Sequence, residues 1–377
     1  MKVKLESFLQ EVCEKTTENN QYPVLTSSKA GLFLQSEYFN KQVASKDNIG
    51  YKIIKRGQFT YRAMSDTGEF FPNLLECTDI GIVSPAYPVF EIAKKDVIEP
   101  EFLKFYFKSS GFQQSIASFV EGSTRTSVRY GKLKTVSIDL PDIDEQRRII
   151  TVLNKAEKII DFMGEEIKKL DDLIKARFVE LFGDPVSNSK GLDELTLPEL
   201  GEFGRGVSKH RPRNAPELLG GKYPLIQTGE VANSGLYITD YANTYSELGY
   251  QQSKMWNAGT LCITIAANIA KTAILNFDAC FPDSVVGFKA NEKTNEIFIH
   301  YWFSFFQAIL EAQAPESAQK NINLKTLSEL KVITPDIEEQ NKFANFVERV
   351  DKSKVAVQKA LDEAQLLFYS LMQEYFG

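Results

Sequence analysis

The clearest pattern along the chain is a heptad repeat of apolar residues in two segments, 144–180 and 338–374. Alternating steps of four and three residues connect apolar positions, with one charged residue in each series, Arg177 and Lys354. Because this spacing places the side chains along one stripe of a helix, it predicts two long helices with a coiled-coil seam. The defining seam positions are Ile149, Leu153, Ile160, Ile167, Leu170 and Ile174 in the first segment, and Phe343, Val347, Val357, Leu361 and Phe368 in the second.

Both helical segments belong to an internal repeat. Residues 121–183 align without a gap onto residues 315–377. The anchor of the alignment is Pro141-Asp142-Ile143-Asp144-Glu145-Gln146, which matches Pro335-Asp336-Ile337-Glu338-Glu339-Gln340. Further upstream, Tyr22-Pro23-Val24-Leu25 resembles Tyr223-Pro224-Leu225-Ile226. Such self-similarity indicates that the chain consists of two copies of one unit.

Each copy combines a globular part with a helix. The globular parts, 1–140 and 195–334, hold short apolar runs that are typical of strands, together with long loops and a few helices. The helical parts, 141–183 and 335–377, are rich in strong helix formers, and the polar residues 184–194 are expected to form a linker. The strand-like runs are 51–54, 261–265 and 285–288, and the helical runs of the globular parts are 101–109 and 296–310.

The expected fold class is α+β, with two similar mixed α/β domains joined by two long antiparallel helices and related by a pseudo-two-fold. A helix of about 37 residues is roughly 55 Å long. The matched length and register of the two seams favour a coiled coil formed within one chain. The alternative is two independent domains whose helices fold back locally or pair between two chains.

Composition limits the chemistry that this chain can perform. It has 377 residues, 43% of them hydrophobic, and no apolar run approaches the ~20 residues of a membrane span. Its cysteines are scattered without a CxxC pair and it has only two histidines, so we expect no metal site. The Asn/Asp-Pro-Pro-aromatic motif of amino-methyltransferases and the GxxxxGK[ST] phosphate loop are both absent from the sequence. We therefore expect a cytoplasmic protein that is not an enzyme, binds no cofactor itself and has no membrane partner.

Charge is unevenly distributed along the chain. The formal net charge is −6, which is unusual for a chain that binds nucleic acid alone. Basic residues nevertheless cluster in segments 41–62 and 204–222, each of which contains a single acidic residue. Two similar domains held at a fixed spacing suit a split DNA target, and their divergent sequences suggest that the two half-sites differ.

These features are similar to those of the specificity subunit of Type I restriction–modification enzymes. The resemblance rests on the Pro-Asp-Ile-(Asp/Glu)-Glu-Gln start of both helices, on 176–185 at the end of the first helix, and on 223–229. It covers the whole chain and is weakest inside the first globular part. The resemblance implies that 1–140 and 195–334 are target recognition domains, each reading one half of a bipartite, asymmetric sequence in double-stranded DNA.

The resemblance also implies the partners. The paired helices would set the spacer between the half-sites and dock two adenine methyltransferase subunits, which two motor–nuclease subunits can then join. Those subunits, rather than this chain, would use S-adenosylmethionine, ATP and Mg. The helix faces away from the seam, with Arg147, Arg148 and Lys155 among their residues, are the expected docking surface.

DNA contacts are expected at basic and carboxamide side chains, because these neutralise phosphates or pair with base edges. The candidates are Lys46, Lys52, Lys55, Arg56, Arg62, Arg125 and Arg129 in the first domain, and Arg205, Lys209, Arg211, Arg213, Asn268 and Lys271 in the second. The alternative for each is a surface group that contacts only solvent. A different function would be a non-catalytic coiled-coil scaffold whose globular ends bind protein, without salt-dependent affinity for duplex DNA.

Overall fold

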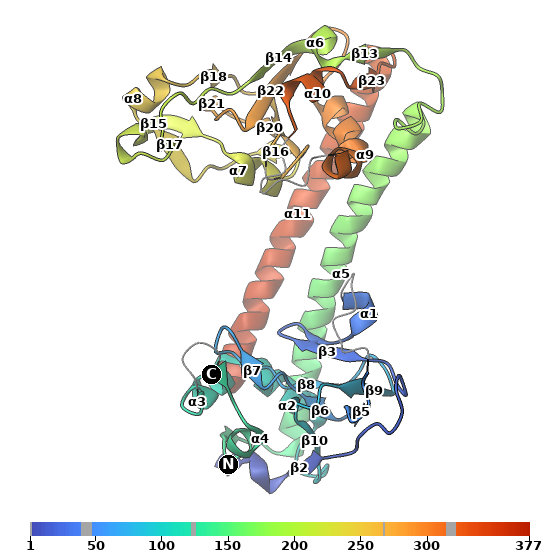
Figure 1. Cartoon of the computed structure of the whole chain (residues 1–377), viewed down its shortest axis with the longest axis vertical. Coiled ribbons are helices and arrows are strands. Elements are labelled where there is room, and N and C mark those ends of the chain that lie inside the picture. The colour runs from blue at the N-terminus through green and yellow to red at the C-terminus, as the bar shows by residue number, and fades with distance from the viewer. Residues whose placement is uncertain (1, 39–46, 122–125, 267, 314–321) are drawn as a thin grey trace. The chain divides into compact units, whose positions relative to one another are not determined.

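The computed structural model describes residues 2–38, 47–121, 126–266, 268–313 and 322–377. The chain forms two compact units. The first consists of Met1–Gly164 with Ala360–Gly377, and the second of Glu165–Lys359. Each unit contains one end of each long helix, α5 (Ile143–Phe182) and α11 (Ile337–Phe376), together with one globular domain (Figure 1). The globular parts 1–140 and 195–334 are called the first and second domain below.

Both long helices begin directly after a Pro-Asp pair. In α5 the Asp142 carboxylate accepts a hydrogen bond from the Glu145 backbone N at 2.9 Å, which caps the first turn. Acidic side chains occupy the first turns of α5 and α11, where the helix dipole favours negative charge. At the other end, α5 stops before Gly183, whose φ of 77° lies in the left-handed region that glycine adopts readily.

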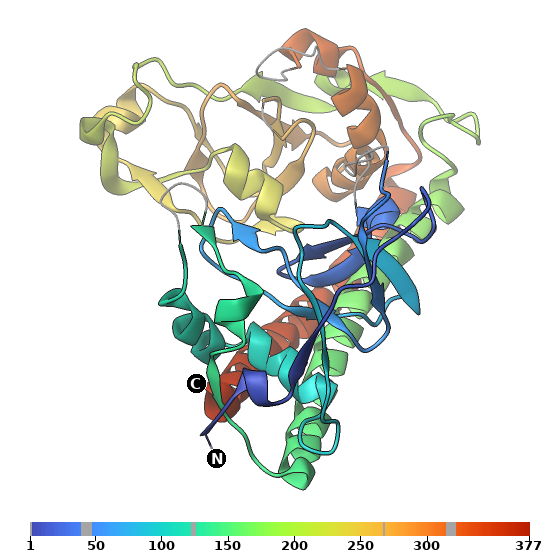
Figure 2. The same ribbon diagram turned by 60° about the horizontal axis from the view of Figure 1, so that its bottom comes forward.

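The two helices pair antiparallel, which confirms this part of the predicted fold. In the first unit the start of α5 and the end of α11 share one hydrophobic core, to which Leu153 and Phe376 both belong. In the second unit the end of α5 meets the start of α11, and the ring centroids of Phe178 and Phe343 are 5.3 Å apart. Two views agree that α5 and α11 lie side by side (Figure 1, Figure 2). Helices that only folded back locally would not make these contacts.

The seam positions differ in how deeply they are buried. Near the helix ends, Ile149, Leu153, Ile174, Phe343 and Val347 are buried. Further along the helices, Ile160, Ile167, Leu170, Val357, Leu361 and Phe368 are half-buried. The difference arises because the terminal positions also belong to the cores of the globular domains, in addition to facing the partner helix.

The first domain is built on a four-stranded antiparallel sheet with the order β2-β10-β6-β8. Its strands are β1 (Lys2–Lys4), β2 (Leu9–Val12), β3 (Leu25–Ser28), β4 (Gly31–Leu34), β5 (Lys52–Lys55), β6 (Phe59–Thr60), β7 (Met64–Ser65), β8 (Asn73–Leu74), β9 (Ile80–Val83), β10 (Val89–Ile92), β11 (Thr126–Ser127) and β12 (Ser137–Asp139). Its helices are η1 (Leu5–Ser7), α1 (Gln35–Tyr38), α2 (Pro100–Lys108), α3 (Ser110–Ala117) and α4 (Tyr130–Leu133). Aromatic rings from the sheet and α2 meet edge to face in the core, as Phe90 and Phe107 do at 6.2 Å.

The second domain repeats this architecture with a five-stranded sheet, β14-β22-β19-β20-β16, and a four-stranded sheet, β17-β15-β21-β18. Its strands are β13 (Glu194–Thr196), β14 (Gly201–Arg205), β15 (Leu219–Leu225), β16 (Tyr237–Ile238), β17 (Asn243–Tyr245), β18 (Met255–Trp256), β19 (Leu261–Thr264), β20 (Thr272–Leu275), β21 (Ala279–Cys280), β22 (Val285–Ala290) and β23 (Lys331–Ile333). Its helices are α6 (Leu197–Leu200), η2 (Pro216–Leu218), α7 (Thr228–Asn233), α8 (Glu247–Gln251), α9 (Glu296–Gln313) and α10 (Leu324–Ser328).

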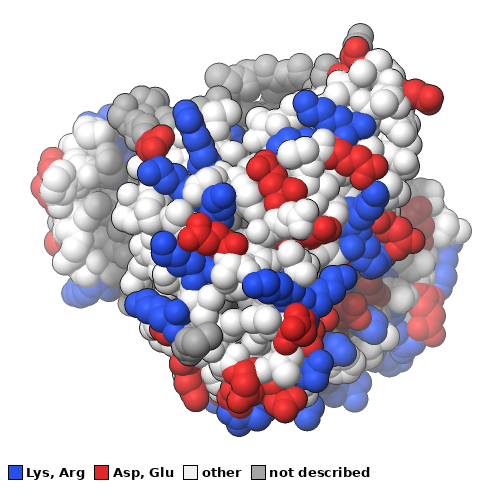
Figure 3. All heavy atoms as spheres, turned by 90° about the horizontal axis from the view of Figure 1, so that it is seen from below, with Lys and Arg blue, Asp and Glu red and all other residues white. Residues whose placement is uncertain are grey.

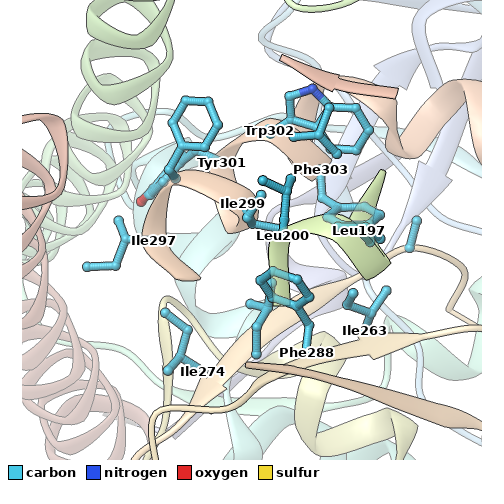
Figure 4. Packing of buried hydrophobic residues seen from close by; sticks show 14 of the residues in the cluster. Leu197, Leu200, Ile263, Ile274, Phe288, Ile297, Ile299, Tyr301, Trp302 and Phe303 are labelled. Carbon is cyan, nitrogen blue, oxygen red and sulfur yellow. The ribbon is translucent and has the colours of Figure 1, made fainter. Parts of the chain in front are cut away.

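The core of the second domain lies between its sheet, α6 and α9. Leu197 and Leu200 of α6 and Trp302 of α9 pack with Ile263 and Phe288 of the sheet (Figure 4). All five are fully buried. Burying each such side chain contributes roughly 1.5–3 kcal/mol. Because the same core includes residues from the end of α5 and the start of α11, the domain and the helix ends are expected to form one rigid body.

Candidate nucleic-acid interface

A buried glutamine of the helix-start motif attaches each domain to its long helix. Gln146 Oε1 accepts a hydrogen bond from Glu99 N at 2.9 Å, and its Nε2 donates to the carbonyls of Val97 and Pro141, both at 3.0 Å. The side chain has 0% exposure. This explains why a polar residue occupies a buried position at the start of α5: it satisfies backbone groups of the loop before α2 and of Pro141, just ahead of α5.

The second copy uses the same device. Gln340, also fully buried, accepts a hydrogen bond from Thr294 Oγ1 at 2.8 Å. Its Nε2 donates to the carbonyls of Lys293 and Pro335 at 3.0 and 2.8 Å. Each glutamine therefore fixes the orientation of its domain relative to the start of the long helix. The position of any binding surface on the domain depends on this orientation.

Two of the three basic residues in segment 52–56 of the first domain are paired with acids from distant segments. Lys55 Nζ lies 2.7 Å from Glu14 Oε2, and this hydrogen bond and charge raise the pKa of Lys55. Arg56 Nε lies 2.7 Å from Asp79 Oδ1. Lys52 begins β5 and is half-buried. These side chains lie together on one strand and the turn that follows it, but their positive charge is largely balanced locally.

Arg62 lies apart from that strand and lines a pocket of about 800 Å³. Its guanidinium is 3.6 Å from Asp66 Oδ2, and about half of the side chain is exposed. Most of the other lining residues are polar, charged or aromatic, and they include Thr26, Ser27, Lys29, Tyr38, Tyr51, Ser65, Thr67, Ser84 and Tyr87. A concave surface with a cation, hydroxyl groups and aromatic rings is suited to a polar, flat ligand such as a nucleic-acid base.

In the second domain the loop 207–215 carries three of the predicted residues. Gln252 Oε1 accepts hydrogen bonds from the backbone N of Lys209 and of His210, at 2.6 and 3.0 Å, which holds the loop. Arg211 donates hydrogen bonds to two carbonyls of its own loop, so it also stabilises the loop conformation. Both Arg211 and Arg213 are paired with the carboxylate of Asp283. One carboxylate facing two guanidinium groups leaves the loop with net positive charge.

Arg213 lines a second pocket, of about 320 Å³. The pocket is also lined by Asn214, Gln227, Thr228, Tyr245, Ala266, Pro282 and Ser284. Asn214 and Gln227 are exposed, so carboxamide groups are accessible here. Of the predicted residues that the structure describes, Arg62 and Arg213 are the ones that line these two pockets.

The remaining predicted residues are placed individually. Arg129 is exposed and precedes α4, Arg205 is exposed at the end of β14, Asn268 is exposed and Lys271 is half-buried before β20. Lys46 and Arg125 lie outside the described residues. On the face shown in Figure 3, Lys and Arg side chains are interspersed with Asp and Glu and do not form one continuous basic patch. All these DNA contacts stay predictions.

The long helices carry a second candidate surface. In the first unit, Phe162 of α5 and Leu366, Leu367 and Tyr369 of α11 are between 56% and 72% exposed. Large apolar side chains exposed in this number on a helix are typical of a surface that another protein covers. By contrast, Arg147 and Arg148 of the predicted docking face are already paired, with Glu99 at 2.8 Å and Glu145 at 2.6 Å.

A half-buried histidine, His300, lies where the second domain meets α11. His300 Nδ1 is 2.9 Å from Thr272 Oγ1. Burial lowers the pKa of His300 to about 4, and nearby Lys354 acts in the same direction while Thr272 and Asp171 oppose it. The imidazole is therefore neutral at pH 7. Burial also raises the pKa of Asp351.

Sequence reasoning missed most of the pocket-lining residues. The one available signal was the repeated Tyr22-Pro23 and Tyr223-Pro224, since the segments that follow them, 24–28 and 225–228, contribute to the two pockets. Within the described residues there is no group of His, Cys, Asp and Glu side chains that could hold a metal ion. No described helix is both long and apolar enough to cross a membrane.

The chain matches the family model of the Type I restriction modification DNA specificity domain twice, over residues 6–172 and 190–364. Since the matches cover most of the chain, it belongs to this family, as the sequence resemblance predicted. Among its relatives, the specificity subunit assigned to type I restriction enzyme MjaX of Methanocaldococcus jannaschii is 24% identical over 289 residues, 71% of this chain and 66% of that protein. The MjaIX specificity subunit of the same organism is 31% identical over 204 residues, 49% of this chain and 46% of that protein. The matched stretches thus span less than two thirds of either relative's length.

Solved structures show the same fold. The S subunit of a Type I restriction–modification system from M. genitalium has a TM-score of 0.58 and 14% identity, with 100% of this chain and 96% of that chain covered. A chain from a structure of complex assembly and conformational transition in the type I system has a TM-score of 0.57 and 18% identity, with 100% and 97% covered. At these identities the likeness establishes the fold alone.

Proposed function

We propose that this chain is the DNA sequence-specificity subunit of a Type I restriction–modification complex. Each recognition domain reads one half of a bipartite, asymmetric target, and the α5–α11 pair sets the spacer. The observation that carries the proposal is the duplicated family domain, each copy rigidly joined through Gln146 or Gln340 to one end of an antiparallel helix pair. Divergent side chains in the two domains support half-sites of different sequence.

In this proposal the chain acts in the cytoplasm and catalyses no reaction itself. Its partner subunits carry out the catalysis. Two adenine methyltransferase subunits use S-adenosylmethionine, and two motor–nuclease subunits, where present, use ATP and Mg. The net charge of −6 and the pairing of Lys55, Arg56 and Arg213 with acids support DNA binding that is strong only in the assembled complex. The exposed apolar side chains of α5 and α11 support docking of the methyltransferase on the helices.

The test is to express the full chain with its methyltransferase partner and to map methylated adenines across a genome. We expect one split motif with a constant gap, and no methylation when this chain is omitted. A continuous motif would contradict two separated readers. Failure to methylate, together with a lack of salt-dependent affinity for duplex DNA, would favour a protein-binding scaffold instead.

Independence of the two readers is tested by exchanging residues 195–334 for the recognition domain of a relative. Only one half of the methylated motif should change, because the first domain and both helices are retained. A change in both halves would contradict independent reading, and a changed gap would show that the exchanged domain, rather than the helices, sets the spacer.

A further inference from the structure

The two domains can be compared position by position through their strand registers. In the first domain Thr60 of β6 pairs with Val89 of β10. In the second, Thr264 of β19 pairs with Val285 of β22 in the same place in the sheet order. Both threonines have 0% exposure. The same β-bridge geometry therefore makes Thr60 and Thr264 equivalent positions of the repeat.

A second register agrees with the first. Val24 forms a parallel bridge with Ile82, and Leu225 forms a parallel bridge with Cys280. Parallel pairs are few in these mostly antiparallel domains, so a parallel pair at the same place in both copies is a specific match. Val24 and Leu225 are thus equivalent, as the Tyr-Pro repeat of the sequence indicates.

These equivalences bring the two pockets into the same place in the repeat. Arg62 and Ala266 each lie two residues after the matched threonine, and each lines its pocket. Likewise, Thr26 and Gln227 each lie two residues after the matched Val24 and Leu225. The third matched pair is Ser84 and Pro282, which lie two residues after Ile82 of β9 and Cys280 of β21, the partners in the two parallel bridges. Three separate segments therefore converge on one pocket in both domains, although the lining side chains differ.

We propose that these equivalent pockets are the base-reading sites of the two recognition domains, and that Arg62 and Asn214 determine specificity. The inference rests on the proposed function. Two domains that read different half-sites need a pocket at the same place in the fold, but with different side chains in its lining. The matched strands provide the common place, and the polar lining residues differ between the two domains. The ligand is the base edges of one DNA half-site.

The linings suit different bases. Arg62 is half-exposed, and its guanidinium lies 3.6 Å from Asp66 Oδ2, which is too long for a hydrogen bond. The side chain can therefore reorient toward the two acceptors of a guanine edge. The second pocket has alanine at the equivalent position. Its exposed Asn214 carries the carboxamide that matches the donor and acceptor of adenine, whereas Gln227 takes part in the capping box of α7.

The experiment uses the full chain with its methyltransferase partner and genome-wide mapping of methylated adenines. In Arg62→Ala, discrimination at one base pair of one half-motif should fall about tenfold or more, with the other half unchanged. Lys95→Ala, which removes an exposed cation of the same domain outside the pocket, should leave the motif unchanged. Asn214→Ala should relax one position of the other half-motif only. The matched control is Asn233→Ala, which removes an exposed carboxamide at the end of α7, outside the pocket.

The outcomes separate this inference from the proposed function. If the wild-type complex methylates a split motif and Arg62→Ala lowers methylation equally at every site, then Arg62 contacts phosphate or supports the fold, and base reading in this pocket is refuted. If both pocket variants keep the wild-type motif, the inference also fails while the proposed function stands. If the wild-type complex methylates no split motif, the proposed function fails first. Retained discrimination in the unaltered half-motif shows that each variant is folded.

Discussion

Lys354 Nζ lies 2.5 Å from Asp171 Oδ1, so the charged seam position of α11 is paired with a carboxylate of α5. Lys354 is 19% exposed and Asp171 47% exposed. At the repeat offset of 194 (315 minus 121), the equivalent residues are Ile160 and Gln365. The ion pair is therefore a feature of one copy only. A single polar pair in an apolar seam specifies register at some cost in stability.

Asp171→Ala should lower the free energy of unfolding by about 1–2 kcal/mol, because it leaves the more buried Lys354 without this carboxylate. Lys354→Ile, which introduces the residue of the other copy, should be neutral or stabilising, since it continues the apolar seam. Denaturant unfolding measures both. As a control, Lys169→Ala removes one member of an exposed pair with Glu165 and should change stability by less than about 0.5 kcal/mol. A larger loss in Lys354→Ile than in Asp171→Ala would contradict this account.

Gln146→Met should lower the free energy of unfolding by about 2–4 kcal/mol. Methionine fills the same space, but it leaves the carbonyls of Val97 and Pro141 and the Glu99 N–H without their partner. Thr294→Val, which removes one of the three hydrogen bonds of Gln340, should cost about 1 kcal/mol. The exposed Gln365→Met is the matched control. Equal stability of Gln146→Met and Gln365→Met in thermal unfolding would show that the buried glutamine does not anchor the domain.

The pH dependence of stability should contain a contribution from His300. Its pKa of about 4 in the folded protein is below the ordinary value of 6.5, so between these values the unfolded chain binds a proton that the folded protein does not. Stability is thus lost as pH falls through this window, by about 2 kcal/mol at pH 4.5. Asp351, whose pKa is raised, opposes this trend, but it does so in the wild type and the variant alike.

The comparison is between wild type and His300→Gln, which removes the titration and keeps a side chain able to hydrogen-bond Thr272. The variant should lose less stability than the wild type between pH 7 and pH 4.5 in denaturant unfolding. Parallel pH profiles for the two proteins would mean that His300 titrates normally in the folded state.

The sequence predicted the helices and the repeat far better than the interface. A heptad seam and a Pro-Asp start are local signals, and α5 and α11 follow them. The apolar run 261–265 likewise became β19. The interface was not predictable in this way, because each pocket combines segments that are distant in sequence. Counting charges along the sequence has the same limit: segment 41–62 contains one acid, but folding brings Glu14 and Asp79 to its cations.

The carboxylate of Asp283 should restrain DNA binding by the second domain, because it is paired with both Arg211 and Arg213. In Asp283→Asn the pairing is lost, and the two guanidinium groups become available to phosphates. We expect the affinity of the assembled complex for non-specific duplex DNA to rise several-fold at low salt, and the slope of log K against log salt to steepen by about one. Binding titrations over a series of salt concentrations measure both quantities.

The control for this prediction is Glu165→Gln, which changes the net charge equally, from −6 to −5, at an exposed helix position paired with Lys169. If loop 207–215 lies at the DNA, Asp283→Asn should exceed this control, whereas equal effects would place the loop away from the duplex. Reduced affinity in Asp283→Asn would have a different meaning: the carboxylate would then orient Arg213 for binding, and Arg213→Ala should reduce affinity to the same level.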